Sequence, residues 1–279
     1  MKRLVLLALF WINFASASPF PDTIQPNSLL HHAYRVYSQY GEEGVLDAIF
    51  QRLGIEQGFL VEFGGYDGVN MSNTRVLAER GWSGAFIEPN DNLYRLMVEN
   101  FRSLPNIHCI KEYITPFEND PQGKTFDAIA DAYFPNQEID VLSIDIDGLD
   151  HLIFKNLKRK PKLIIIEGGM FWHPMMQLEV PDEVAALNVQ QPIIVMNHYA
   201  NDQGYQLICS TFNAFFIRND LYHHFTAINN NPSLIWWEAM LHMKNIASYF
   251  YNVDFQIIRR FEWIQDWERK DPNITFSVP

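Results

Sequence analysis

Short apolar runs alternate with segments of helical periodicity through the middle of the chain. The apolar runs are rich in Val, Ile, Leu and Phe, as buried parallel strands are, and cover residues 60–63, 84–87, 107–110, 140–146 and 162–166. Apolar positions at helical spacing separate them, and predict helices over residues 72–80, 93–101, 126–133 and 149–157. This alternation predicts an α/β fold whose sheet is mostly parallel.

The flanks of this pattern extend the predicted fold. Residues 45–53 have helical spacing after Ser38, a candidate cap, and two closing strands are expected at residues 205–209 and 214–217. The pattern weakens over residues 170–191, which we interpret as a substrate loop with a helix at 183–188. The predicted organisation is listed here: a signal peptide (1–17), an extended lead-in (18–37), a Rossmann-like domain (38–220) and a helical, aromatic-rich C-terminal extension (221–279).

A glycine-rich turn follows the first predicted strand. Gly64, Gly65 and Gly68 lie close together there, and glycines let a backbone approach a ligand closely. The following helix start supplies free N–H groups. Glu88, which follows the second strand about 20 residues further on, is placed to accept hydrogen bonds from the two hydroxyls of a ribose.

Acidic residues end most of the predicted parallel strands. Asp145 and Asp147, two residues apart at the end of the fourth strand, would alternate along it and lie on one face, and Glu167 ends the fifth. Because the carboxyl ends of parallel strands meet at one edge, these acids should gather there. One interpretation is that one acid binds a cofactor while the other caps the next helix; Mg²⁺ or Mn²⁺ binding, with Glu167 or His173 added, is the alternative.

The first residues have the three parts of a secretory signal peptide. Lys2 and Arg3 precede an apolar run at 4–12, and Ala15-Ser16-Ala17 offers a cleavage site. The run is short for a membrane span. The sequence therefore predicts an extracytoplasmic chain in the secretory pathway, with an uncleaved anchor or a cytosolic helix as the alternatives.

The net charge and the two cysteines disfavour several kinds of partner and site. The formal net charge of -12 disfavours a nucleic acid, whose phosphates require clustered Lys and Arg. Cys109 and Cys209 each lie inside an apolar run, which indicates two buried thiols rather than a disulfide or a metal site. Oligomeric state leaves no mark in the sequence.

Several of these segments together resemble the FkbM-like family of S-adenosylmethionine-dependent methyltransferases. The matching pieces are SQYGEEGVLDAIF from Ser38, FLVEFGGYDGVNMSNTRVLAERGWSGAFIEPN from Phe59, DVLSIDIDGLD from Asp140, LIIIEGG from Leu163 and GYQLICSTFNAFFIRNDL from Gly204. The resemblance implies a seven-stranded Rossmann-like sheet with S-adenosyl-L-methionine as the cofactor. It implies a cofactor site made by the residues listed here: Glu62, Gly64, Asp67 and Gly68 in the turn, Glu88 on the ribose, and Asp145 near the sulfonium. Carboxylates beside a sulfonium cation are electrostatically favourable.

The same resemblance implies methylation of a hydroxyl on a sugar or sugar-containing metabolite. Such a reaction needs an in-line approach and a group that takes the hydroxyl proton. The catalytic candidates are Asp147, His151 and Glu167, with His173 as a further possible base. No metal ligand is assigned.

Two other classes of protein would show the same sequence features. A metal-dependent glycosyltransferase of the secretory pathway also carries a D-x-D after an apolar strand, here Asp145 and Asp147. A non-catalytic secreted or membrane-associated module is the third class; the evidence for it is the G-G-Y-D-G spacing at Gly64 and the aromatic tail, a candidate membrane-contact surface.

Overall fold

The computed structural model describes residues 20–169, 172, 179–186 and 189–246. The predicted signal peptide, His173 and residues 247–279 of the predicted extension lie outside the described residues. The helices, 3₁₀ helices (η) and strands are η2 (Leu29–His32), α2 (Glu42–Leu53), β1 (Phe59–Phe63), α3 (Arg75–Glu79), β2 (Ser83–Ile87), α4 (Asp91–Asn100), β3 (Ile107–Ile110), α5 (Phe126–Tyr133), β4 (Val141–Ile144), α6 (Asp150–Asn156), β5 (Leu163–Glu167), α7 (Asp182–Ala185), α8 (Ile193–Asp202), β6 (Tyr205–Ser210), β7 (Asn213–Arg218), η3 (Asn219–Phe225) and α9 (Pro232–Ile246).

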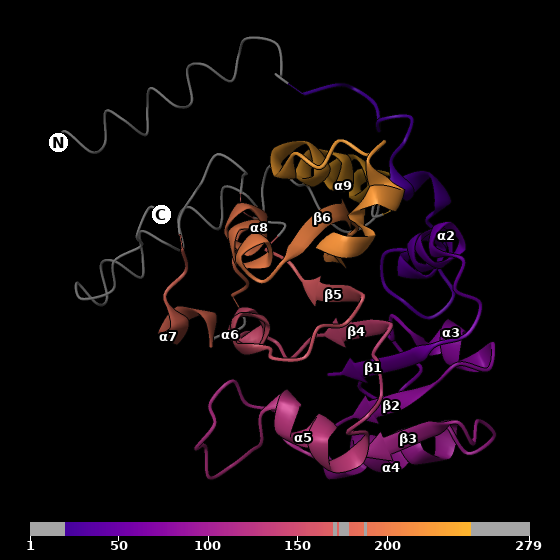
Figure 1. The fold of residues 1–279 in the computed structure, drawn as a ribbon, viewed down its shortest axis with the longest axis vertical. Helices are drawn as coiled ribbons and strands as arrows, with labels where there is room; N and C mark the ends of the chain where they lie inside the picture. The colour runs from indigo at the N-terminus through magenta and orange to yellow at the C-terminus, as the bar shows by residue number, and fades with distance from the viewer. Residues whose placement is uncertain (1–19, 170–171, 173–178, 187–188, 247–279) are drawn as a thin grey trace, which may run out of the picture.

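The strands form one seven-stranded sheet in the order β3-β2-β1-β4-β5-β7-β6. The pairs among β1 to β5 are parallel, whereas β7 runs antiparallel to both β5 and β6. Figure 1 shows β3 and β2 at one end of the sheet and β6 at the other. The predicted Rossmann-like, mostly parallel sheet with flanking helices is confirmed.

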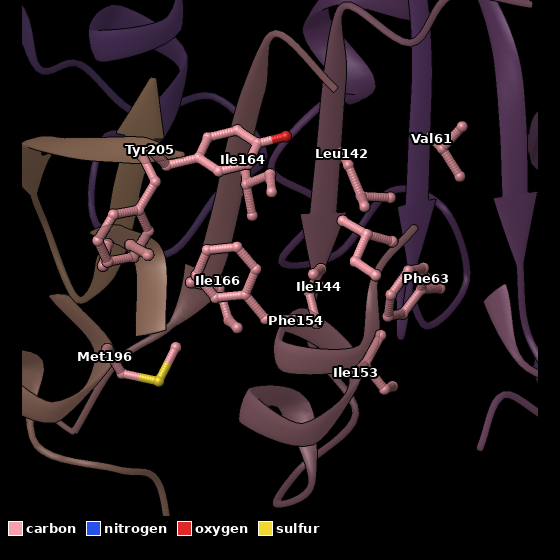
Figure 2. Packing of buried hydrophobic residues seen from close by; sticks show 14 of the residues in the cluster. Val61, Phe63, Leu142, Ile144, Ile153, Phe154, Ile164, Ile166, Met196 and Tyr205 are labelled. Atoms are coloured by element: carbon pink, nitrogen blue, oxygen red, sulfur yellow. The ribbon is translucent and has the colours of Figure 1, made fainter. Parts of the chain in front are cut away.

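Helices cover both faces of the sheet, so alternate residues of each strand enter different hydrophobic clusters. On β1, Val61 and Phe63 belong to the cluster with α5, α6, α8 and α9, while Leu60 belongs to the one with α2, α3 and α4. Figure 2 shows Phe63, Ile144 and Ile166 on neighbouring strands, with Ile153 and Phe154 of α6 beside them. Burial on both faces explains why the strands read as continuous apolar runs.

Most predicted elements are confirmed within a few residues, and the differences have local causes. The helix after the glycine turn begins at Arg75 rather than residue 72, because Thr74 is held by hydrogen bonds to Glu62. Helix α8, in a region where no helix was predicted, begins after Pro192 and buries residues on most of its circumference, which hides its periodicity. Cys109 and Cys209 are free thiols, as predicted, but only Cys209 is fully buried; Cys109 is partly exposed.

The lead-in is not extended throughout. Leu29 and Leu30, inside the predicted extended segment, form η2 and are buried in the core. Helix α9 confirms the helical prediction for residues 232–246 and packs on β6 and η2. Its Trp236 is buried, while Trp237 stacks on Phe20 with ring centroids 5.2 Å apart. Within the described ranges, no helix combines the length and apolar character that a membrane span requires.

Candidate functional site

The glycine turn after β1 is shaped by two close approaches. Gly64 has φ 74°, and a Cβ there would lie 1.3 Å from the backbone oxygen of Asp145. Gly68 has φ 75°, and its Cβ would lie 2.2 Å from the ring of Phe101. Both glycines are therefore required by the packing of the turn against β4 and α4.

Glu62 of β1 holds residues 72–74, which connect the glycine turn to α3. Its carboxylate accepts hydrogen bonds from Thr74 N (2.8 Å), Thr74 Oγ1 (2.6 Å), Ser72 Oγ (3.1 Å) and Asn73 N (3.2 Å). Burial raises the pKa of Glu62, and these donors work against that rise. Both oxygens are occupied by the protein itself, so the structure makes Glu62 a support for the turn rather than a group that faces a ligand.

Asp67 has a similar local role. Its side chain accepts from Val69 N (3.0 Å), Asn70 N (2.8 Å) and Asn70 Nδ2 (2.7 Å). It therefore fixes the second half of the turn. Tyr66 has φ 54° and is exposed, which places its ring on the outside of the turn.

Glu88 follows β2, the neighbour of β1. It is 6% exposed, and its Oε1 accepts from Asn90 N at 2.8 Å. Burial raises the pKa of Glu88, and the Asn90 hydrogen bond opposes the rise. No donor within the described residues bonds to Oε2, so one oxygen of Glu88 is available to a ligand.

The acids after β4 and β5 converge as predicted. One carboxylate oxygen each from Asp145, Asp147 and Glu167 lies within 4.8 Å of the other two. Burial raises the pKa of Asp145 well above its usual range, and the negative charge of Glu167 raises it further. Gln190 Nε2 donates to Glu167 Oε2 at 2.6 Å. We call Asp145, Asp147 and Glu167 the acid cluster; its repulsion favours a cationic ligand.

The route to this convergence differs from the prediction. Strand β4 ends at Ile144, so Asp145 and Asp147 lie in a turn and do not alternate along a strand. Asp147 has φ 60° and does not cap α6, whose N-cap is Leu149 without a side-chain hydrogen bond. Asp150, which the sequence analysis did not single out, shapes this turn by accepting from Ile146 N (2.7 Å) and Gly148 N (2.9 Å).

The structure directs His151 away from the acid cluster. The side chain is 2% exposed and Nε2 bonds to Asp182 Oδ1 at 3.1 Å. Its ring stacks on Tyr199 of α8. Nδ1 is buried and has no partner among the described residues. Burial lowers the pKa of His151, and Asp182 opposes that shift, so the neutral imidazole is favoured.

The sequence did not predict a buried polar network around Glu42. Glu42 is 0% exposed, and its Oε1 accepts from Thr211 Oγ1 (2.6 Å) and Asn213 Nδ2 (3.1 Å). Asn73 Nδ2 donates to Ser143 Oγ at 3.1 Å. These contacts join segments up to 171 residues apart, so no local pattern announces them.

A cavity of about 560 Å³ lies elsewhere. It is bounded by residues 115–120, by Phe126 of α5, by Ile153 of α6 and by Leu157 just after that helix. None of the predicted site residues lines it. The cavity is therefore separate from the acid cluster and the glycine turn.

Comparisons with known proteins return resemblance in structure only. No family profile matches the sequence, and no curated protein matches it. A putative caffeoyl-CoA O-methyltransferase from Staphylococcus aureus is 12% identical, with 68% of this chain and 87% of that chain covered and a TM-score of 0.44. A TehB-like SAM-dependent methyltransferase from Corynebacterium glutamicum is 10% identical, with 78% and 98% covered and a TM-score of 0.40.

A third solved structure, the N-terminal domain of EvdMO1 with SAH bound, is 11% identical, with 72% of this chain and 90% of that chain covered and a TM-score of 0.43. Identities this low concern the fold alone. The function of this chain must therefore be argued from its own residues.

Proposed function

We propose that the chain is an S-adenosylmethionine-dependent methyltransferase of the FkbM-like type that methylates a hydroxyl on a sugar or sugar-containing metabolite. The observation that carries the proposal is the position of two acids, Glu88 and Asp145, on either side of the glycine turn. Each has a carboxylate oxygen that accepts no hydrogen bond from the described residues. The substrate class and the family type rest on the sequence resemblance.

The sheet topology supports a ligand at this place. Strand β1 has β2 on one side and β4 on the other, so the chain reverses its direction of strand addition beside β1. Ligands of open α/β sheets bind outside the carboxyl ends of the strands at such a switch point. Gly64, Glu88 and Asp145 all lie at those ends of β1, β2 and β4.

The residues present fit this cofactor. Gly64 and Gly68 let the turn pack closely against Asp145 and Phe101, which sets its backbone beside the acid that follows β4. The open oxygen of Glu88 suits ribose hydroxyls, which are hydrogen-bond donors. The acid cluster suits a positive charge.

When bound, S-adenosylmethionine supplies an electrophilic methyl group on a sulfonium, and the acceptor oxygen forms the new bond as the carbon–sulfur bond breaks. Asp145 stabilises positive charge at the rim of the sheet. Asp147, the exposed member of the acid cluster, or Glu167, oriented by Gln190, takes the hydroxyl proton. His151 is assigned no proton transfer, because its hydrogen bond and stacking contact lead to α7 and α8.

The proposal is tested by transfer of a labelled methyl group from S-adenosylmethionine to a panel of sugars and glycosides. We expect transfer by the wild type and its loss in Asp147→Asn combined with Glu167→Gln. Binding of S-adenosylhomocysteine by this double variant shows that the cofactor site persists. A folded wild type that binds the cofactor and methylates no member of the panel would contradict the substrate class.

The convergence of the acid cluster also favours a second candidate, a metal-dependent glycosyltransferase. Three carboxylate oxygens within 4.8 Å of one another match the hard oxygen ligands of Mg²⁺ or Mn²⁺. This alternative leaves Glu88 and the glycine turn without a role. Calorimetric binding of a sugar nucleotide that requires Mn²⁺, without binding of S-adenosylhomocysteine, would favour it.

We also propose that the chain enters the secretory pathway through residues 1–17, on the sequence pattern alone. Two glycosylation sequons give a test, Asn70-Met71-Ser72 and Asn273-Ile274-Thr275. Asn70 bonds to Asp67, and Ser72 is buried against Glu62, so a glycan at Asn70 would disrupt the turn. Expression in a secretory host should give glycosylation at Asn273 only, removed by Asn273→Gln; a chain that carries none would contradict the localisation.

A further inference from the structure

Arg75, the first residue of α3, is buried beneath the glycine turn and 7% exposed. Its Nη1 donates to the backbone oxygen of Gly68 at 3.3 Å and to that of Asn100 at 3.2 Å. Its Nε bonds to Glu79 Oε1 at 3.0 Å. One guanidinium therefore joins the glycine turn, the end of α4 and its own helix.

The same region is held from two further directions. The Arg75 guanidinium lies 4.5 Å from the ring centroid of Phe101, the ring against which Gly68 packs. In addition, Asn100 Nδ2 donates to the backbone oxygen of Asp67 at 3.0 Å. The second half of the turn is thus held to the end of α4 through its carbonyl groups.

Only arginine has the geometry for this contact. Its planar guanidinium presents several N–H donors in fixed directions and can stack on an aromatic ring while it donates. A lysine at this position would keep the charge near Glu79 but has one compact ammonium group in place of the planar group. Because the guanidinium is buried and its donors point to protein oxygens, it is a support and not a ligand contact.

We infer that Arg75 is a positioning residue that fixes the glycine turn in its cofactor-binding shape. This inference rests on the proposed function. The turn would contact the cofactor equally before and during methyl transfer, so its loosening reduces uniform binding and leaves the chemical step unchanged. The expected signature is a rise in Kd and KM for the cofactor with little change in kcat.

The test compares Arg75→Lys with Arg159→Lys. Arg159 also donates to a carboxylate, Asp131 Oδ1 (2.6 Å), and to a backbone oxygen, Pro135 O (3.1 Å), but on the loop after α6. We expect Arg75→Lys to weaken S-adenosylhomocysteine binding about tenfold, to raise the KM for S-adenosylmethionine similarly and to change kcat less than about twofold. Arg159→Lys should leave all three values unchanged.

Amide hydrogen exchange reports on the turn without any activity. Arg75→Lys should speed exchange in residues 64–74 and not in residues 127–135, and Arg159→Lys should do the reverse. Asn100→Ala, which removes the bond to Asp67, gives a second variant with the same expected direction should Arg75→Lys fold poorly.

The outcomes separate the two claims. A folded wild type that binds no S-adenosylhomocysteine overturns the proposed function and the cofactor role of Arg75 with it. Wild-type binding that Arg75→Lys and Asn100→Ala leave unchanged, with unchanged exchange in residues 64–74, overturns the inference alone.

Discussion

Two acidic turns at the carboxyl edge of the sheet look alike in sequence and differ in chemistry. The first follows β1, contains Asp67 and Gly68, and has Glu62 of β1 beside it; the second follows β4 and contains Asp145, Asp147 and Gly148. Both turns use a glycine with positive φ, 75° at Gly68 and 151° at Gly148. Their carboxylates nevertheless have different surroundings.

The acids of the first turn are hydrogen-bonded within it. Glu62 and Asp67 accept from backbone amides, hydroxyls and an amide side chain of residues 69–74. In the second turn, Asp150 takes that structural role. The side chain of Asp145 has no hydrogen bond within the described residues, and its burial, together with the negative charge of neighbouring carboxylates, raises its pKa.

Hydrogen bonding distinguishes acids that hold the fold from acids that could serve a site. A buried carboxylate whose oxygens are bonded by the protein stabilises local structure. One that is surrounded by like charge is costly to the fold and becomes favourable when a cation is bound. By this criterion Glu62 and Asp67 hold the turn, and Asp145 is a candidate site acid. Glu88 is a second candidate because no donor within the described residues bonds to its Oε2.

The largest expected effect breaks the first turn. Glu62→Gln replaces a buried acceptor by an amide whose Nε2 faces donors, and should lower the free energy of unfolding by about 2 to 3 kcal/mol. Urea denaturation measures it. Glu99→Gln, at an exposed acid of α4, is the control and should change the free energy by less than about 0.5 kcal/mol. Equal losses in both variants would contradict the scaffold role of Glu62.

The second prediction concerns Asp145→Asn, which should act in the opposite direction on stability. Relief of repulsion should stabilise the unliganded protein by about 1 kcal/mol, a fraction of the ~4 kcal/mol between two charges 4 Å apart at an effective dielectric of 20. Methyl transfer should fall about 100-fold, the usual cost of losing one electrostatic group in a site. A destabilised variant with near wild-type activity would make Asp145 a scaffold acid.

The pH dependence of this stabilisation follows from the raised pKa of Asp145. The folded state holds the Asp145 proton more tightly than the unfolded state, so the wild type loses stability as pH rises above the ordinary aspartate value of about 4. The advantage of Asp145→Asn should therefore grow from acid to neutral pH. Urea midpoints of both proteins across that range measure it, and a constant difference would exclude the shifted pKa.

The smallest effect is expected at His151, outside both turns. His151→Phe keeps the ring against Tyr199 and loses the hydrogen bond to Asp182. We expect kcat to change less than about twofold and the unfolding free energy to fall by about 1 kcal/mol. Methyl-transfer kinetics and thermal unfolding measure the two effects. A tenfold fall in kcat would return His151 to the reaction as a base.

The fold was largely predictable because burial on both sheet faces leaves continuous apolar runs. The strand at Ile107–Ile110 and the helix at Phe126–Tyr133 match their predicted bounds. Acids at strand ends could be assigned to one edge because the carboxyl ends of parallel strands meet there. Helix α8 was missed because its buried residues are not confined to one face.

The roles within the site were less predictable because they depend on partners. The donors that satisfy Glu62 come from a loop whose conformation is not visible in the sequence. Asp182, the partner of His151, lies 31 residues away, and the Glu42 network spans still longer separations. The supporting role of Arg75 can be recognised only once Gly68 and Phe101 are known to lie in contact.

The most direct test of the account is calorimetric titration of S-adenosylhomocysteine into the full chain and into Glu88→Gln. We predict micromolar binding by the wild type and about tenfold weaker binding by the variant, because a charged acceptor for ribose is lost. Wild-type affinity should fall as the pH is lowered, and at a higher pH than an ordinary glutamate would give, since burial raises the pKa of Glu88. No heat from the folded wild type, or equal binding by both proteins, would contradict a cofactor site at Glu88.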